Sequence, residues 1–266
     1  MNAEIIAWWA GAGTAIIFAI TFFLSYRANN YGFVDVAWSY SVGLGAVFYA
    51  LCGAGWPPRR LAIGALMVLW SARLGTHLLR RVSRAHPHED PRYHEMRDRW
   101  PTFFKTKMAA VFLFQALLVW LLDGPAWLAV QNDTSRFLPL EFTGLAVGLF
   151  AMVGEAIADR QLSAFKRAPS NAGQVCAVGL WRYSRHPNYF FEWLFWVGVA
   201  LLVWPSPRGE YGLIAPIAML VFLASITGIP PAERQSVRSK GDRYREYQRS
   251  TSAFFPWPPR APSPQP

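Results

Sequence analysis

Seven stretches of the chain are dominated by apolar residues and separated by polar or basic segments. A membrane-spanning helix needs about 20 consecutive apolar residues, because its backbone polar groups must be satisfied within the segment. The stretches that meet or nearly meet this length are about 5–26, 34–52, 61–79, 108–130, 138–158, 190–204 and 211–229. The sixth is short, and Asp123-Gly124-Pro125 interrupts the fourth. The pattern predicts an all-α, polytopic membrane protein with seven transmembrane helices.

The composition supports a membrane protein and excludes a disordered chain. Of 266 residues, 53% are hydrophobic and only 16% are charged, whereas a soluble domain carries about a quarter charged residues. Thirteen Trp and nineteen Phe residues are typical of a surface that meets lipid. The net charge of +10 would suit nucleic acid, but the placement of the charges argues against that partner.

The distribution of Lys and Arg predicts the orientation of the spans. With the N-terminus outside, the predicted cytoplasmic segments hold 21 Lys and Arg residues and the opposite loops hold four. These cytoplasmic segments are 27–33, 80–107, 159–189 and 230–266. The positive-inside rule therefore predicts an external N-terminus and a cytoplasmic C-terminus.

We expect one integral membrane domain over residues 1–266. Its parts would be substrate-side helices and a cytoplasmic loop in 1–130, a C-terminal region in 138–258, and a frayed tail in 259–266. Cys52 and Cys176 fall on opposite sides of the predicted membrane, so we expect no disulfide between them.

Ionisable residues within the predicted spans mark candidate functional positions, because inserting one into a bilayer costs about 2.5–3.5 kcal/mol or more. Asp35 opens the second span, either as an early-turn acid favoured by the helix dipole or as a protonated carboxyl in an apolar setting. On the third span, basic residues recur every three or four positions and share one helix face: Arg73, His77, Arg80 or Arg81, and Arg84. Snorkelling toward water is the alternative explanation for the outer members of this stripe.

The loop at 86–94 is dense in His, Glu and Asp residues. Its spacing fits no familiar zinc pattern and no cysteine lies near it, so we expect no metal. We predict instead a folded loop in which Asp90, Arg92 and Tyr93 meet an anion.

The most specific stretch is 179–193, Gly-Leu-Trp-Arg-Tyr-Ser-Arg-His-Pro-Asn-Tyr-Phe-Phe-Glu-Trp, which joins a cytoplasmic loop to the sixth span. It offers two guanidinium groups suited to phosphates, an imidazole, an amide, two phenols and a carboxylate. A solvated basic loop would not need Asn188 and Glu192 one helical turn apart in an apolar segment. Glu155 and Asp159, four residues apart on the fifth span, either pair with a basic residue or hold ribose hydroxyls.

These residues resemble the bacterial branch of the steroid 5α-reductase family, DUF1295-like membrane proteins with the steroid-reductase C-terminal domain. The resemblance spans most of the chain. Besides 179–193 it includes 30–38, 73–78, 89–93, 159–162 with 165–166, 241–248 and 251–256. The Arg-His-Pro-x-Tyr core alone is also similar to isoprenylcysteine carboxyl methyltransferases and phospholipid methyltransferases, whereas the combination is specific.

The resemblance implies an NADPH-dependent reductase of the bacterial inner membrane with its cofactor site facing the cytoplasm. Its substrate would be a conjugated carbon–carbon double bond in a hydrophobic enone, such as a 3-oxo-Δ4-steroid. By position, Asn188 and Glu192 match residues at the nicotinamide, and Asp159 matches an acid on the cofactor. Basic residues matching the phosphate and nucleotide region are Arg73, His77, Arg81, Arg84 and Lys166, and Tyr247 lies in the C-terminal Tyr element. We add neighbouring groups of suitable chemistry to the predicted cofactor site: Asp90, Arg92, Tyr93, Arg167, Arg182, Tyr183, Arg185 and His186.

The substrate side departs from the family pattern. Val34-Asp35 stands where eukaryotic members have a Gln-Glu pair, and Trp70 replaces a Tyr on the third span. Phe191 replaces a Gly before the motif Glu, and Glu233-Arg234 aligns loosely with a His-rich stretch.

Reduction of an enone sends a hydride to the β-carbon while negative charge develops on the carbonyl oxygen. A preorganised donor must meet that charge where water is scarce. We expect Asp35 to supply it, with Tyr40 and Tyr189 in reserve, and Asp35, Trp38 and Trp70 to contact the substrate.

Two other function classes fit part of the sequence. A methyltransferase that uses S-adenosylmethionine shares the Arg-His-Pro core, but the Arg and Lys residues along 73–84 and 160–167 favour a multiply phosphorylated cofactor. A non-enzymatic lipid-binding protein could use its basic faces on anionic headgroups, but it leaves Asn188, Glu192 and Asp159 unexplained. We expect an enone lipid or steroid and membrane lipids as partners, no nucleic acid, and a monomer.

Overall fold

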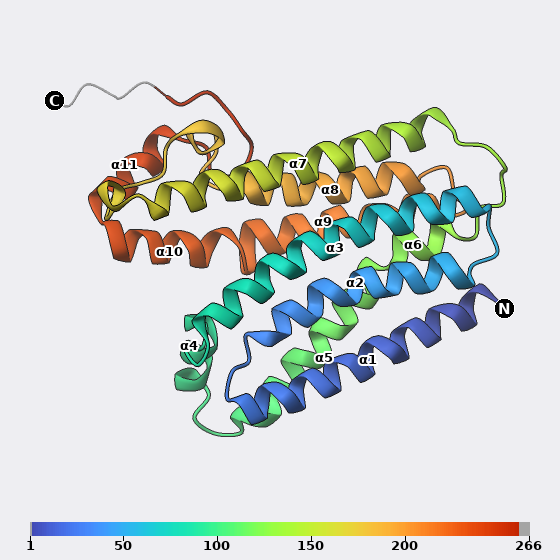
Figure 1. Ribbon diagram of the computed structural model, residues 1–266, viewed down its shortest axis with the longest axis horizontal. Coiled ribbons are helices and arrows are strands. Elements are labelled where there is room, and N and C mark those ends of the chain that lie inside the picture. The colour runs from blue at the N-terminus through green and yellow to red at the C-terminus, as the bar shows by residue number, and fades with distance from the viewer. Residues whose placement is uncertain (1, 261–266) are drawn as a thin grey trace. The chain divides into compact units, whose positions relative to one another are not determined.

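The computed structural model describes residues 2–260 and is built of helices (Figure 1). Within these residues there is no strand, so the all-α prediction is confirmed. Of the predicted tail at 259–266, residues 261–266 lie outside the described part of the chain.

Six helical segments are long and apolar enough to cross a membrane. They are Ala3–Ala28, Phe33–Cys52, Pro57–Ala85, Phe104–Ala129, Pro139–Arg167 and Gly209–Lys240. The helix α8 (Pro187–Val203) is apolar but has only 17 residues. The helices support an integral membrane protein, while the seventh span and the orientation stay predictions.

The chain packs into two compact units, of which the first comprises residues up to 141 together with 202–212. Its central helix is α2 (Phe33–Cys52), which contacts four neighbours. These are α1 (Ala3–Ala28), α3 (Pro57–Ala85), α5 (Phe104–Leu122) and α6 (Gly124–Ala129). The predicted interruption at Asp123-Gly124-Pro125 is the junction of α5 and α6.

Local sequence explains where the helices of the first unit begin and end. The side chain of Asn2 caps α1 by accepting a hydrogen bond from Glu4 N (3.1 Å), and Asn29 ends α1 in a left-handed conformation, with φ of 50°. The helix α3 runs to Ala85 rather than ending near 79, so the whole basic stripe lies on one helix. Asp90 caps α4 (Pro91–Arg99) by accepting from Arg92 N at 3.0 Å.

The second unit comprises residues 142–201 and those from 213 onward. Most of it is helical. Its elements are α7 (Pro139–Arg167, from residue 142), η1 (Pro169–Asn171), η2 (Gly179–Arg182), α8, α9 (Ile214–Val221), the π-helical turn η4 (Phe222–Ile226), α10 (Ile229–Lys240) and α11 (Asp242–Ser250).

The helices α7 and α8 pack closely and antiparallel, because glycines leave room at two points. A Cβ on Gly198 would meet the backbone of Gly148, and a Cβ on Gly154 would meet the ring of Phe191. Phe191, which departs from the family pattern, therefore fills space that a glycine on the facing helix leaves open.

The two units are a division by packing, and the predicted parts 1–130 and 138–258 stay a prediction. The boundary falls inside α7, between 141 and 142, and residues 202–212 belong to the first unit. Long helices therefore pass from one unit into the other.

Candidate cofactor and substrate site

In the first unit, a network of charged side chains joins α2 to α3 and α4. The Arg92 guanidinium donates to Asp35 Oδ2 at 2.6 Å, and the Tyr93 hydroxyl donates to Asp35 Oδ1 at 3.1 Å. Arg81 Nη2 lies 3.4 Å from Asp35 Oδ2 and 3.5 Å from Asp90 Oδ2. Two carboxylates and two guanidinium groups thus form one network, with Arg81 about half exposed.

The apolar setting predicted for Asp35 is wrong. A carboxyl that accepts from two guanidinium groups and a phenol is held as an acceptor, not as a donor to a substrate oxygen. The reason lies in α4, which returns Arg92 and Tyr93 to the start of α2. Burial and the charge of Asp35 raise the pKa of Tyr93 well above its usual value, so its hydroxyl keeps its proton.

Asp90 belongs to the same network and also orders α4. Its oxygens accept from Arg92 Nε at 3.0 Å and from Arg92 Nη2 at 3.1 Å. Burial alone would raise the pKa of Asp90, but the hydrogen bonds and charge of Arg92 lower it below its usual value. Asp90, Arg92 and Tyr93 lie together in one network with Asp35, and their contact with an external anion stays a prediction.

The basic stripe of α3 runs from the interior to solvent. Arg73 is half-buried, with Nε and Nη2 enclosed, whereas His77, Arg81 and Arg84 are exposed. The three- and four-residue spacing on one continuous helix keeps these groups on one face. The stripe is arranged so that an anion can contact its outer members.

The other candidate residues of the first unit lie between α2 and α3. Tyr40 Oη lies 3.0 Å from Thr76 Oγ1, and either atom can donate. Trp70 is fully buried and meets Trp38 edge to face, with ring centroids 6.0 Å apart. Trp70 therefore packs in the core. Within residues 2–260, the Tyr40 hydroxyl pairs with the Thr76 hydroxyl.

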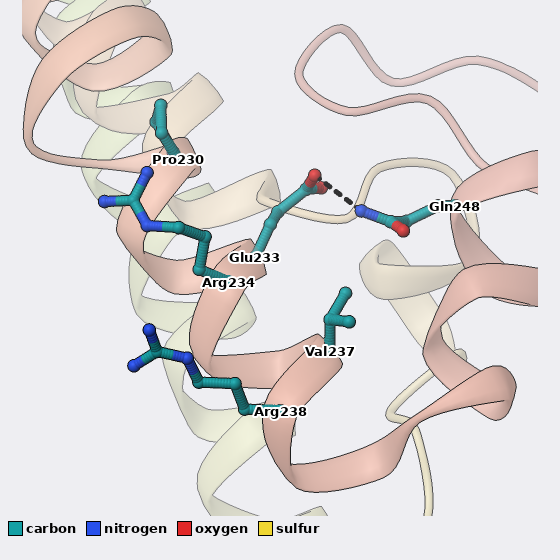
Figure 2. Close-up of a pocket in the computed structure, with 6 residues that line it drawn as sticks. All are labelled: Pro230, Glu233, Arg234, Val237, Arg238 and Gln248. Carbon is teal, nitrogen blue, oxygen red and sulfur yellow. Dashed lines mark hydrogen bonds between the residues drawn. The ribbon is translucent and has the colours of Figure 1, made fainter.

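In the second unit, Arg185 is committed to internal partners. It donates to Glu233 Oε1 at 2.6 Å, to the Thr251 carbonyl at 2.5 Å and to the Gln248 carbonyl at 2.9 Å. Glu233 Oε2 also accepts from Gln248 Nε2 at 2.8 Å (Figure 2). Arg185 thus joins the motif loop to α10 and α11, and its contact with a cofactor stays a prediction.

His186 and Tyr189 form the next part of the motif. Their rings stack with centroids 5.3 Å apart and planes 3° from parallel. His186 Nε2 lies 3.4 Å from Glu233 Oε1, and the His186 amide donates to Ser184 Oγ at 3.1 Å. Glu233 therefore contacts two adjacent basic residues of the motif, Arg185 and His186.

Asn188 and Asp159 meet between α8 and α7. Asn188 Nδ2 donates to Asp159 Oδ1 at 3.3 Å. The amide oxygen Oδ1 of Asn188 is buried and has no hydrogen-bond partner among residues 2–260. Glu192, one turn further along α8, accepts from Trp196 Nε1 at 3.1 Å. An unmatched buried acceptor costs free energy unless a ligand supplies the donor.

The motif loop is docked on α7 by backbone hydrogen bonds. Gly179 has φ of 58° and lies against Gln161, whose Oε1 accepts from Leu180 N at 2.9 Å. Trp181 Nε1 donates to the Ala158 carbonyl at 2.9 Å. A side chain at residue 179 would be strained by the positive φ and blocked by Gln161.

Of the remaining predicted cofactor residues, four are exposed and one, Tyr247, is buried. Lys166, Arg167, Arg182 and Tyr183 are exposed. Tyr247 is buried, and its hydroxyl donates to the backbone carbonyls of the motif loop; burial raises its pKa. Tyr247 thus supports the loop from within, and the exposed groups stay available to an anion.

Sequence reasoning missed several residues that organise these regions. Glu89 accepts from Tyr31 N at 2.8 Å and from Arg97 Nη2 at 3.2 Å, so it fixes the turn before α2. Ser184 bonds the Phe254 carbonyl at 2.8 Å. Glu89 and Ser184 each lie in a segment of family resemblance, whereas Arg97 lies outside these segments and acts through side chains distant in sequence or in the preceding loop.

Comparison with known proteins supports the resemblance at the level of the family. A fission yeast protein, "Uncharacterized protein C594.04c" of Schizosaccharomyces pombe, is 28% identical over 88% of this chain and 74% of its own length. Residues 21–251 match DUF1295, described as a protein of unknown function, a family related to the steroid 5α-reductases. The match begins within α1 and ends just after α11, and the chain therefore belongs to the DUF1295 family.

Proposed function

We propose that this protein is an NADPH-dependent reductase of a conjugated carbon–carbon double bond in a hydrophobic enone. The observation that carries the proposal is the buried oxygen of Asn188, which lacks a donor among the described residues while its nitrogen is held by Asp159. A primary carboxamide such as that of nicotinamide offers the missing N–H. The relation of the family to steroid 5α-reductases supports the same reaction class.

The exposed cations supply the complementary charge for the phosphates. Lys166, Arg167 and Arg182 serve this role in the second unit, which also carries Asn188. Guanidinium groups bind phosphate oxygens through paired, charge-assisted hydrogen bonds. Bound NADPH would supply the hydride, and Asn188 and Asp159 would orient its nicotinamide end.

Tyr40 becomes our candidate for the donor that polarises the enone oxygen. Asp35 is occupied by Arg92, Arg81 and Tyr93, so it acts by positioning α4. The Thr76 hydroxyl can donate to Tyr40 Oη, 3.0 Å away, which leaves the Tyr40 proton for a carbonyl oxygen. A donor fixed between two helices in a water-poor setting stabilises developing charge more than one in water.

Calorimetric titration of the detergent-purified protein with NADPH, NADH and S-adenosylmethionine tests the class of cofactor. We expect binding of NADPH with a clear preference over NADH. Binding of S-adenosylmethionine alone would assign the Arg-His-Pro motif to methyl transfer and reject the reductase. If NADPH binds, loss of its absorbance with a 3-oxo-Δ4-steroid and with an isoprenoid enone measures turnover.

Variants separate cofactor binding from catalysis. Asn188→Ala should weaken NADPH binding about tenfold or more, because one buried hydrogen bond is worth about 1–3 kcal/mol once its partner is left unpaired. Gln235→Ala, which removes an exposed amide on α10, is the control. Tyr40→Phe should lower kcat while the NADPH affinity is kept; full activity of that variant would reject Tyr40 as the donor.

A further inference from the structure

An open groove of about 510 Å³ lies on α10 and α11 of the second unit (Figure 2). Pro230, Arg234 and Arg238 line it and recur every four residues of α10, so they share one helix face. Both arginines are exposed. Their guanidinium groups extend side by side from the helix in Figure 2. The groove therefore presents two guanidinium groups on a single surface.

The one carboxylate that lines the groove is engaged elsewhere. Glu233 is bonded to Arg185, to His186 and to Gln248, and in Figure 2 it points toward Gln248 and away from the two arginines. Its charge is balanced by the motif loop, so it does not neutralise Arg234. The groove is consequently suited to an anion.

The segment that precedes α10 has an apolar exposed surface. Ile217, Val221 and Ile226 are 59%, 48% and 54% exposed, in a segment apolar enough to span a membrane. Arg234 follows Ile226 by eight residues, across the break at Thr227 and Gly228 that separates η4 from α10. Helical side chains lean toward the N-terminus of their helix, so the arginines lean toward the end of α10 that follows the apolar segment.

We propose that this groove binds the phosphate of an acidic phospholipid. Arg234 and Arg238 hold the headgroup, and the acyl chains lie along the exposed apolar surface around Val221 and Ile226. A phospholipid carries a charged phosphate at one end and hydrocarbon chains at the other. The protein likewise has two guanidinium groups in the groove and an exposed apolar surface on the segment that precedes α10. A nucleotide phosphate would use the arginines and leave the apolar surface without a partner. The site is independent of the reductase proposal, since it uses neither Asn188 nor Tyr40.

Native mass spectrometry of the protein in mixed micelles, titrated with phosphatidylglycerol or phosphatidylcholine, tests the proposal. We expect retained phosphatidylglycerol on the wild-type protein and much weaker retention of phosphatidylcholine. The double variant Arg234→Gln/Arg238→Gln should bind phosphatidylglycerol about 30-fold more weakly, from about 1 kcal/mol per basic residue.

The matched control is Arg243→Gln/Arg249→Gln, which removes the same charge from exposed positions on α11 outside the groove. This variant should retain phosphatidylglycerol as the wild type does. Equal loss in both double variants would show a net-charge effect and overturn the site. Displacement of the lipid by NADPH, or loss of NADPH binding in Arg234→Gln/Arg238→Gln alone, would assign the arginines to the nucleotide and overturn it as well.

Discussion

Arg59 and Glu141 form an ion pair whose side chains are entirely shielded from solvent. Arg59 Nε donates to Glu141 Oε1 at 2.5 Å, and Nη2 donates to Oε2 at 3.2 Å. The same guanidinium donates to the backbone carbonyls of Asn132, Thr134 and Arg136. Sequence counting treats Arg59 only as a loop charge, whereas it joins the start of α3 to the loop before α7.

Replacing Arg59 should destabilise the fold strongly. Arg59→Met leaves Glu141 buried without its partner, which costs about 3–5 kcal/mol. Thermal unfolding in detergent should show a large fall in Tm. The double variant Arg59→Met/Glu141→Met should recover part of the loss, because the buried charge is gone while the backbone carbonyls stay unpaired. An unchanged Tm in Arg59→Met would contradict a structural role for the pair.

At the scale of elements, α4 depends on the ionised carboxylate of Asp90. Its pKa is lower in the folded protein than in the unfolded chain, where it is about 3.9. The carboxylate therefore contributes stability that is fully present above about pH 4 and is lost as the pH falls through the folded value. Hydrogen exchange of the α4 amides should accelerate below about pH 4, relative to the intrinsic rate at each pH.

Two variants separate the cap of α4 from the charge of Asp90. Asp90→Asn keeps an N-cap acceptor but loses the ion pair with Arg92, so its α4 protection should vary less with acid pH than that of the wild type. Asp90→Ala removes both and should cost about 1 kcal/mol more of local stability. If the protection of α4 amides changed with acid pH in the same way in Asp90→Asn and in the wild type, a group other than Asp90 would control the pH dependence of α4 stability.

The contact of α2 with the α5–α6 junction has no room for a methyl group. A Cβ at Gly45 would overlap the carboxyl of Asp123, which is fully buried. Gly45→Ala should therefore lower stability by about 1–3 kcal/mol through overpacking, although alanine favours a helix. Adding Asp123→Ala to this variant should restore much of the loss in thermal unfolding.

Gly13→Ala on α1 is the control for this prediction, since no atom lies within 4 Å of its added Cβ. It should leave stability unchanged or raise it by about 0.5–1 kcal/mol, as expected for alanine in a helix. Equal effects at Gly45 and Gly13 would show that the close approach at Asp123 is not limiting.

The sequence predicts where helices form better than it predicts which side chains bond to one another. Apolar length alone located six helices long enough to cross a bilayer, and Asp123-Gly124-Pro125 correctly predicted a break. By contrast, Asp35 meets Arg92, which is 57 residues away, and Tyr247 bonds backbone carbonyls that have no sequence signature. Features set by neighbouring residues in the sequence were predictable. Hydrogen bonds between residues far apart in the sequence were not, because they depend on how the helices pack.

At the scale of the whole molecule, the number of spans depends on α8. With 17 residues it extends about 25 Å, somewhat less than a hydrocarbon core of about 30 Å. It nevertheless packs antiparallel along α7, through the contacts at Gly154 and Gly198. The chain after α8 then bonds the loop that precedes α7, where Asn132 donates to the Pro205 carbonyl at 3.3 Å.

These contacts require α8 to cross the same layer as α7, which predicts seven spans and termini on opposite sides. In a Cys52→Ser/Cys176→Ser background, single cysteines at exposed positions 135, 174 and 208 can be labelled with a membrane-impermeant maleimide. We expect labelling at 135 and 208 in intact cells, and at 174 only after permeabilisation, because the charge distribution puts 159–189 in the cytoplasm. Labelling of 208 only after permeabilisation would mean that α8 does not cross, leaving six spans. Asn188 and Glu192 lie on α8. That result would therefore also mean that a substrate dissolved in the bilayer could not reach the proposed reductase site along a membrane-spanning α8.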